Sequence, residues 1–205
     1  MQHSLTDIME DLKKKIYNTF TEKFQRTPLM VASPGRINLI GEHTDYNYGF
    51  VMPASIDKTI SFALGANEQS TTCRILSVDQ QDTFVFDTQN IQRQEGGWAN
   101  YVLGVAAEIQ ELTQKKLPGF DAVFGGNIPI GAGLSSSAAL ECSLAYGLNQ
   151  LFDLGLSRWE IAKIGQRVEH KYVGVQCGIM DQFASVMGQQ DVVLRLDCLT
   201  LDYET

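Results

Sequence analysis

Residues 36–49 read RINLIGEHTDYNYG. The apolar run INLI is typical of a buried strand, and the run NYG is typical of a turn that sends the chain back as the next strand. Between them stand Glu42, His43 and Asp45, which are more hydrogen-bond acceptors than a turn needs. With Arg36 just before, this cluster suits a polyhydroxylated ligand, because each hydroxyl can donate to a carboxylate. A solvated hairpin turn is the alternative interpretation.

Strand signals around this stretch come in runs, and most helix signals follow later in the chain. A helical face fills the first part of residues 1–28 and ends at Pro28, while Ser157 followed by Glu160 is a capping-box pattern. The absence of a regular strand–helix–strand alternation predicts an α+β fold rather than a doubly wound sheet. The predicted strands cover 29–33, 36–40, 50–54, 58–64, 74–78, 83–87, 120–126 and 191–197, and the predicted helices after the first cover 98–112, 134–152 and about 157–172.

Composition indicates a globular protein and excludes some classes of function. The 205 residues are 44% hydrophobic and 20% charged, which is ordinary for a soluble domain and leaves little room for disorder. The net charge of -8 argues against nucleic-acid binding, which needs a basic face. No apolar stretch is long enough to span a membrane. The four cysteines form no CxxC pair, so we expect reduced thiols in a cytoplasmic protein.

A second polar stretch, GGNIPIGAGLSSSAALE at 125–141, has the features of an anion site. Its glycines let the backbone approach a ligand closely, and the unpaired N–H groups of a following helix favour negative charge. The stretch has no lysine and is therefore not a Walker A loop, and Ser136 stands where a dinucleotide fingerprint needs glycine. The alternative is a glycine turn before a serine-capped helix, although one serine would suffice as a cap.

The third candidate is Asp181, which lies in the apolar stretch IMDQF at 179–183. Carboxylates are rarely buried unless they are paired or functional. The alternative is that Asp181 begins a helix with the following apolar side chains inside. Taken alone, Glu169 and His170 upstream have the pattern of solvated helix residues.

Together these segments closely resemble the galactokinase family of the GHMP sugar and metabolite kinases. The resemblance rests on PGRINLIGEHTDYNYGFVMP (34–53), IPIGAGLSSSAALE (128–141) and EHKYVGVQCGIMDQF (169–183), with WANYVLGV (98–105) also fitting. It implies an N-terminal helix within 1–28 and, over 29–205, a GHMP-kinase N-terminal domain (ribosomal protein S5 domain 2-like) that includes the galactose-binding signature. Such a domain is a mixed, mainly antiparallel sheet packed with helices. The family's C-terminal domain would be absent from this chain, and we expect the 205 residues alone to be inactive.

The resemblance also implies an activity and a set of roles. The γ-phosphate of ATP would pass to the C1 hydroxyl of galactose, with Mg²⁺ as the metal ion. Asp181 would take the hydroxyl proton, while Arg36 would stabilise the developing charge and keep Asp181 ionised. Glu42, His43, Thr44 and Asp45 would hold the sugar, and Ser137 and Glu169 would hold Mg²⁺. The triphosphate would be cradled by Gly131, Ala132, Gly133, Leu134, Ser135, Ser136 and Ser137.

Two alternatives stay open at this point. One is a non-catalytic regulator that binds galactose and ATP on the same fold, and the uninterrupted run SSSAA at 135–139 favours the kinase over it. The other is a kinase for a related sugar such as galactosamine or arabinose. In each case the expected partners are small molecules, with no nucleic acid and no membrane, and the full-length protein is expected to be a monomer.

Overall fold

One mixed sheet organises the part of the chain that the computed structural model describes, which is residues 5–67 and 70–205. In these ranges the seven strands pair in the order β4-β3-β5-β2-β6-β7, and β1 pairs with β2 as well. The strands are β1 (Leu29–Ile40), β2 (Phe50–Asn67), β3 (Thr72–Ser77), β4 (Asp82–Asp87), β5 (Gly119–Gly126), β6 (Arg195–Asp197) and β7 (Tyr203–Glu204). Only β3 and β5 run parallel, so the predicted mainly antiparallel α+β sheet is confirmed.

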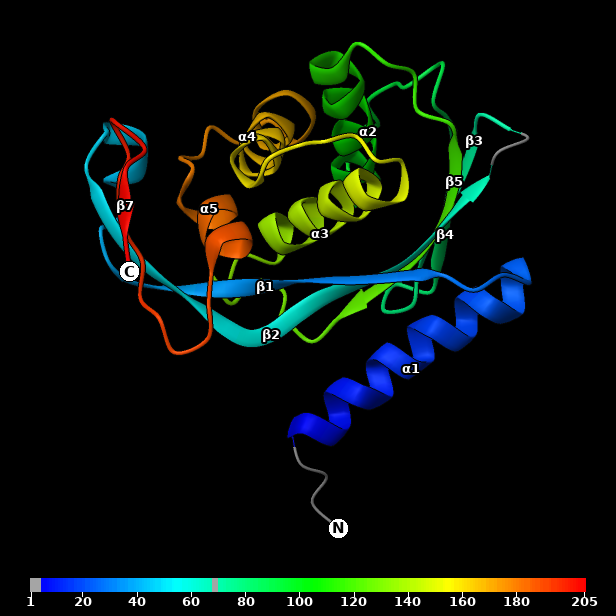
Figure 1. The fold of residues 1–205 in the computed structure, drawn as a ribbon, viewed down its shortest axis with the longest axis horizontal. Coiled ribbons are helices and arrows are strands. Elements are labelled where there is room, and N and C mark those ends of the chain that lie inside the picture. The colour runs from blue at the N-terminus through cyan, green and yellow to red at the C-terminus, as the bar shows by residue number, and fades with distance from the viewer. Residues whose placement is uncertain (1–4, 68–69) are drawn as a thin grey trace.

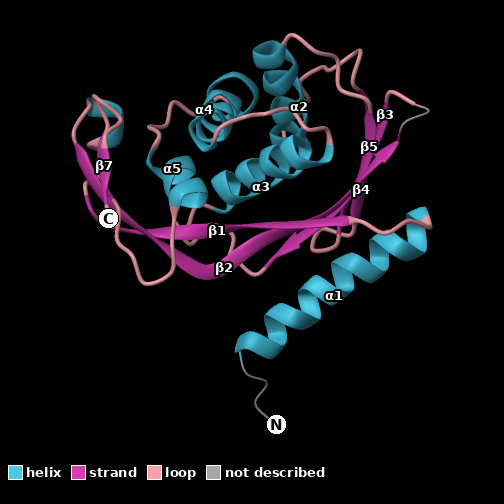
Figure 2. Cartoon of the chain, viewed as in Figure 1, coloured by secondary structure: helices cyan, strands magenta, loops and turns pink. Residues whose placement is uncertain are grey.

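Helices cover both faces of this sheet (Figure 1). The helix α1 (Leu5–Phe24) crosses one face and contacts β2 and β5, with Ile16 and Phe20 fully buried there. The other face carries the remaining α-helices (Figure 2), together with a π-helical turn. These are α2 (Ala99–Thr113), α3 (Ser136–Leu151), α4 (Arg158–Val168), η2 (Glu169–Val173) and α5 (Met180–Met187).

The main core lies between the sheet and α3, which is the most deeply buried helix. Its Ala- and Leu-rich sequence leaves Leu144 and Leu148 fully buried against the sheet residues Phe62, Leu64 and Phe120. Burial on nearly all sides explains why the amphipathic pattern of this helix is weak, because an apolar surround needs no polar face. The start of α3 lies beside β1, where the backbone N–H of Arg36 donates to the carbonyl of Leu134.

The first strand differs from the prediction, because Pro34 and Gly35 do not interrupt it. Strand β1 runs on through both residues, with a shift of register between Pro34 and Arg36. Such an irregularity absorbs the missing proline N–H without ending the strand. The two predicted strands 50–54 and 58–64 are likewise one long strand, β2, and the short helical turn η1 (Asp45–Asn47) precedes it. The predicted reversal of the chain near Gly49 is confirmed.

The C-terminal third departs further from the sequence pattern. The predicted helix at 157–172 begins as expected with the capping box of Ser157 and Glu160, but it widens into η2 after Val168. The predicted strand at 191–197 is shorter, and β7 was not predicted. Each of the four cysteines is a free thiol, as expected. Among the described residues, none of the helices has both the length and the apolar character needed to cross a membrane.

Candidate active site

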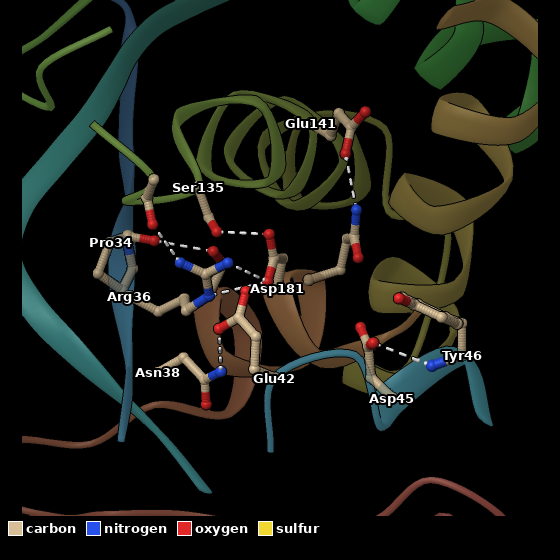
Figure 3. A network of polar contacts seen from close by, with 12 residues as sticks. Pro34, Arg36, Asn38, Glu42, Asp45, Tyr46, Ser135, Glu141 and Asp181 are labelled. Carbon is tan, nitrogen blue, oxygen red and sulfur yellow. Dashed lines mark hydrogen bonds and ion pairs between the residues drawn. The ribbon is translucent and has the colours of Figure 1, made fainter. Parts of the chain in front are cut away.

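Arg36 and Asp181 meet although 145 residues separate them in the chain. The guanidinium of Arg36, on β1, donates to Asp181 Oδ1 through Nε at 2.8 Å and through Nη2 at 2.6 Å (Figure 3). Asp181 lies in the first turn of α5, as its alternative interpretation required, yet it is also paired. Its side chain keeps 30% of its surface exposed, whereas that of Arg36 keeps 12%. A partly open carboxylate held by a nearly buried cation is suited to receive a proton from a ligand.

The loop before α3 supplies the third member of this junction. Ser135 donates from Oγ to Asp181 Oδ2 at 2.5 Å, so both carboxylate oxygens are bound by side chains (Figure 3). Ser135 occupies the N-cap position of α3 with a left-handed φ of 57°, but its side chain does not cap the helix. The simple serine cap that the sequence left open is therefore wrong for Ser135, and the first helical N–H groups keep no side-chain partner from it.

Arg36 also holds the loop itself. Its Nη1 donates to the carbonyl of Gly133 at 2.6 Å, and its backbone N–H donates to the carbonyl of Leu134 at 3.2 Å. The preceding Gly35 allows this approach, because a Cβ there would lie 2.5 Å from the Leu134 oxygen. Gly131 and Gly133 both have positive φ and open space around them, which leaves backbone N–H groups accessible on the loop.

Two serines that the sequence reasoning missed fix α5 against β1. Ser185 donates to the carbonyl of Pro34 at 2.8 Å, and Ser33 donates to the carbonyl of Ser185 at 3.0 Å. Ser185 lies one turn beyond Asp181 on α5, and Ser33 and Pro34 lie three and two residues before Arg36 on β1. These reciprocal bonds hold the two elements that bring the ion pair together. A single serine in a strand or helix gives no sequence signal for such a contact.

The residues of the loop 41–49 lie beside this junction and are less constrained. Glu42 is exposed and accepts a bond of 3.3 Å from Asn38 Nδ2 (Figure 3). His43 is exposed, with Nδ1 at 2.5 Å from the Tyr46 hydroxyl. The hydroxyl of Thr44 lies 2.6 Å from the Gly41 carbonyl and 2.9 Å from the Phe50 carbonyl. Thr44 therefore closes the loop, while Glu42 keeps acceptor capacity for a ligand.

Asp45 is the most buried acid of this loop. Its Oδ1 accepts the backbone N–H of Tyr46 at 2.9 Å, and its side chain is half-buried. Burial raises the pKa of Asp45 above its ordinary value, and the neighbouring Asp181 carboxylate raises it further. The Tyr46 N–H and the Arg36 charge oppose this rise in pKa. The half-buried position makes Asp45 an acceptor that a ligand could contact with little competition from water.

The expectation that Glu169 is a solvated helix residue is wrong, because only 6% of it is exposed. The π-helical turn η2 directs it inward, where burial raises the pKa of its carboxyl and the neighbouring Ser137 hydroxyl opposes that rise. His170 is half-buried rather than solvated, and its Nε2 lies 2.9 Å from the Cys177 carbonyl. Ser137 and Glu169, the two residues that the family resemblance assigns to a metal ion, are therefore neighbours in the structure.

A further carboxyl, Glu141, was not predicted as part of the site. It is fully buried on α3, and its Oε2 accepts a bond of 3.3 Å from Nε2 of Gln182, the neighbour of Asp181 (Figure 3). Burial raises the pKa of Glu141 well above its ordinary value, and the charge of Glu169 raises it further. No sequence signal predicted this burial, because a glutamate in a helix is usually exposed.

The donor set can be tested against Mg²⁺. No group of three or more His, Cys, Asp or Glu side chains in the described part of the chain is arranged to hold a metal ion. Mg²⁺ does not require such a cage, because it keeps several waters and is bound by one or two protein oxygens together with substrate phosphates. One hydroxyl, from Ser137, and one carboxylate, from Glu169, therefore fit Mg²⁺ in that mode.

A cleft of about 330 Å³ opens at the start of α3. Its lining combines the hydroxyl-bearing Ser136 and Ser137 with the aromatic side chains of Trp98 and Phe124. Apolar walls beside a helix N-terminus suit a ligand with a flat ring at one end and an anionic group at the other. The cleft adjoins the loop 131–137 through Ser136 and Ser137.

Comparisons with known proteins match two parts of the chain to family models. Residues 18–66 match the galactokinase galactose-binding signature, and residues 100–189 match the N-terminal domain of GHMP kinases. Over 195 residues the chain is 45% identical to a galactokinase from Mannheimia succiniciproducens, a match that covers 94% of this chain and 50% of the relative. The chain thus spans about half the length of the curated relative it matches.

Solved structures agree with this assignment. The galactokinase of Lactococcus lactis, in a crystal structure with galactose, superposes with a TM-score of 0.88 at 37% identity, over 96% of this chain and 51% of that one. The mevalonate kinase of Methanococcus jannaschii superposes with a TM-score of 0.74 at 19% identity, over 87% and 56% of the two chains, and shows the fold alone. With two family models and a 45% identical relative in agreement, the chain belongs to the GHMP kinases and, among them, to the galactokinase family.

Proposed function

We propose that the protein of which this chain is the matched part phosphorylates galactose at the C1 hydroxyl, with ATP as the phosphoryl donor. The observation that supports this most directly is the junction of Arg36, Asp181 and Ser135. It joins the loop of a candidate phosphate site to a carboxylate that faces a cluster of sugar-type acceptors. Phosphoryl transfer depends on positioning and charge neutralisation more than on covalent chemistry, and this junction offers both.

In this proposal Asp181 accepts the proton of the C1 hydroxyl as the bond to phosphorus forms. A weak base is sufficient, because the proton moves late in a loose transition state. Arg36 lies against Asp181 Oδ1 and against the Gly133 carbonyl, so its charge stands between the base and the phosphate loop. Ser135 restrains the second oxygen of Asp181 and limits rotation of the carboxylate.

We assign sugar binding to Glu42, His43 and Asp45, with Thr44 holding the loop that carries them. Carboxylates accept sugar hydroxyls strongly, and the half-burial of Asp45 increases the strength of such a bond. Triphosphate binding is assigned to the loop 131–137 and the first turn of α3, and the adenine to the aromatic cleft. Ser137 and Glu169 would hold Mg²⁺, which supplies neutralisation of phosphate charge when bound.

The net charge of -8 does not oppose ATP binding, because Arg36 and the helix N-terminus make the field locally positive. We further propose that the protein acts in the cytoplasm as a monomer. A non-catalytic regulator on the same fold is the second candidate. The intact contact between Ser135 and Asp181 favours catalysis, because a protein that only binds its ligands does not need an oriented base.

The decisive experiment replaces the proposed base in the complete natural protein. Asp181→Asn keeps the shape of the side chain but removes its charge, so we expect galactose phosphorylation to fall by roughly 10²–10⁴-fold while ATP still binds. Asp191→Asn, at an exposed position whose φ of 60° suits asparagine, is the matched control. A coupled assay for ADP release gives the rates, and calorimetry gives the ATP affinity. Turnover at the wild-type rate in Asp181→Asn would exclude the assigned base.

The same assay separates the alternatives. A regulator would bind galactose and ATP but release no ADP in the wild-type protein. A kinase for another sugar would show a higher kcat/KM with galactosamine or arabinose than with galactose. We expect galactose to give the highest value.

A further inference from the structure

Glu108 on α2 is a buried carboxylate that forms ion pairs with two cations of a neighbouring segment. Only 1% of its side chain is exposed. Arg167 Nε lies 2.5 Å from its Oε2, and Lys171 Nζ lies 2.8 Å from its Oε1. Each carboxylate oxygen thus has one charged partner, which is the arrangement that offsets the cost of burying a charge. No part of the proposed reaction uses Glu108.

The two cations bracket Glu169. Arg167 is two residues before it and Lys171 two residues after it, at the end of α4 and within η2. Residues two apart on a helical segment point in different directions, whereas residues four apart share a face. Glu108 therefore holds one face of this segment, and Glu169 is presented on another. Figure 1 shows α4 lying beside α2, so the ion pairs of Glu108 connect two neighbouring helical segments.

The segment itself forms a wider turn than an α-helix. The N–H groups of Gly174 and Val175 both donate to the carbonyl of Glu169, at 2.7 and 2.9 Å. Turns of the π type are rare, persist only where the surroundings hold them, and often occur at functional positions. The direction of the Glu169 side chain is set by this turn, so whatever holds the turn also aims that carboxylate.

A second contact from α2 holds the same segment. A Cβ on Gly104 would lie 2.6 Å from Val168 Cγ1 and 3.0 Å from Tyr172 Cγ, so the segment packs directly on the α2 backbone. Gly104 is four residues before Glu108 and lies on the same face of α2. In contrast, Glu169 has no ion pair with a lysine or arginine among the described residues, and its side-chain partner is Ser137.

We propose that Glu108 is a positioning residue for the metal site: by gripping Arg167 and Lys171 it fixes the π-helical turn that aims the Glu169 carboxylate at the Ser137 hydroxyl. The inference rests on the proposed function in one respect, that Glu169 and Ser137 are the protein ligands of Mg²⁺. It adds a residue from a different helix that touches neither the metal nor any substrate. Partners outside the ligand shell orient metal ligands, and their loss typically weakens metal affinity by about 10–100-fold.

The chain offers two matched controls. Glu111 is one turn beyond Glu108 and also pairs with Lys171, at 2.9 Å, but its side chain is 66% exposed and it does not reach Arg167. Asp121 on β5 is a buried carboxylate that likewise pairs with two arginines, Arg26 and Arg74, on the side of the sheet where α1 lies. Glu111→Gln tests the loss of a charge near the segment, and Asp121→Asn tests the loss of a buried ion pair far from the metal ligands.

The experiment measures Mn²⁺ binding to the complete natural protein in the presence of a non-hydrolysable ATP analogue, by electron paramagnetic resonance. We expect Glu108→Gln to weaken Mn²⁺ binding by about 10-fold and Glu111→Gln by less than about twofold. Asp121→Asn should lower the melting temperature but leave the Mn²⁺ affinity unchanged. Galactose affinity, measured by calorimetry, should stay at the wild-type value in Glu108→Gln, because the sugar-binding loop is carried by other elements.

Failure of this inference and failure of the proposed function give different results. Unchanged Mn²⁺ affinity in Glu169→Gln would remove the assigned metal ligand and contradict the proposed function at that point. A loss in Glu169→Gln without a loss in Glu108→Gln would overturn the positioning role alone. If Glu108→Gln does not fold, Lys171→Met replaces it, because this lysine is 45% exposed and its removal cuts the link from Glu108 to η2. An unchanged Mn²⁺ affinity in Lys171→Met would then overturn the inference.

Discussion

The two ends of the proposed site are built in different ways. At the Asp181 end, three side chains from three separate segments bind one another: Arg36 from β1, Ser135 from the loop before α3, and Asp181 from α5. At the other end, the acids of the loop 41–49 bind only neighbours in their own part of the chain, and Glu42 is exposed. One end is assembled by the tertiary fold, and the other by a local loop.

This difference corresponds to the two tasks proposed for the site, which are stabilisation of charge and recognition of a sugar. Groups that stabilise developing charge are most effective when they are already oriented, because no reorganisation is then needed during the reaction. Groups that recognise a sugar must instead keep free acceptor capacity until the ligand arrives, because a saturated acceptor gains nothing from a new hydroxyl. We therefore expect changes at the Asp181 end to reduce kcat, and changes in the loop 41–49 to reduce galactose affinity.

After loss of the base itself, the largest effect is expected for Arg36→Met, which removes the charge that joins the base to the phosphate loop. Methionine keeps much of the side-chain volume, but the bonds to Asp181 and to the Gly133 carbonyl are lost. We expect kcat to fall by about 10³-fold, the scale for a charged group that acts on a transferring phosphoryl. Steady-state kinetics with galactose and ATP measures this. Arg158→Met, at an exposed arginine that opens α4, should leave kcat unchanged, and an equal loss in both variants would contradict the role of Arg36.

The contrast between the two ends also explains what the sequence could predict. The capping box at Ser157 and Glu160 and the reversal of the chain near Gly49 follow from local chemistry, and both are confirmed. The residue types around Asp181 predicted a paired or functional carboxylate, because an acid among apolar neighbours needs a partner. The identity of a partner 145 residues away came from resemblance to a family and not from the pattern itself.

What the sequence missed depends on tertiary contacts. Strand β1 passes through Pro34 and Gly35, because the Leu134 carbonyl approaches there and the register shifts. Glu169 has the local pattern of a solvated residue, yet a π-helical turn buries it. A turn of that kind has no compositional signal, and the carboxylate that pairs with Arg167 and Lys171 on either side of Glu169 comes from Glu108 on another helix. Periodicity reports which face of a segment is apolar, and it cannot report which distant charge reaches that face.

A smaller effect, on affinity rather than turnover, is expected for Asp45→Asn. Loss of one charged hydrogen bond, worth about 1.5–3 kcal/mol, should weaken galactose binding by roughly 10–100-fold. Burial raises the pKa of Asp45, so in the wild-type protein this carboxylate takes up a proton at a higher pH than an ordinary aspartate. Galactose affinity should therefore decline as the pH falls through that raised pKa, and Asp45→Asn should lack this part of the decline.

Calorimetric titration of galactose across a pH series tests the point. Asp57→Asn, at an exposed aspartate of β2, is the matched control and should keep both the affinity and its pH dependence. An identical acidic decline in the wild-type protein and in Asp45→Asn would show that another group causes it.

The smallest effect is expected for the Ser135 hydroxyl, which restrains Asp181 but carries no charge. Ser135→Ala removes the 2.5 Å bond to Asp181 Oδ2, and a hydrogen bond to a charged group of this kind contributes about 1.5 kcal/mol, so kcat should fall by roughly 10-fold. The backbone needs a separate control, because Ser135 has a φ of 57°, where a side chain costs free energy and glycine does not. Ser135→Gly also lacks the hydroxyl but relieves that cost. If the hydroxyl is what matters, both variants lose the same factor in kcat although their melting temperatures differ. If instead the serine only shapes the loop, kcat depends on the backbone conformation and differs between Ser135→Ala and Ser135→Gly. That result would give Ser135 a structural role and no catalytic one.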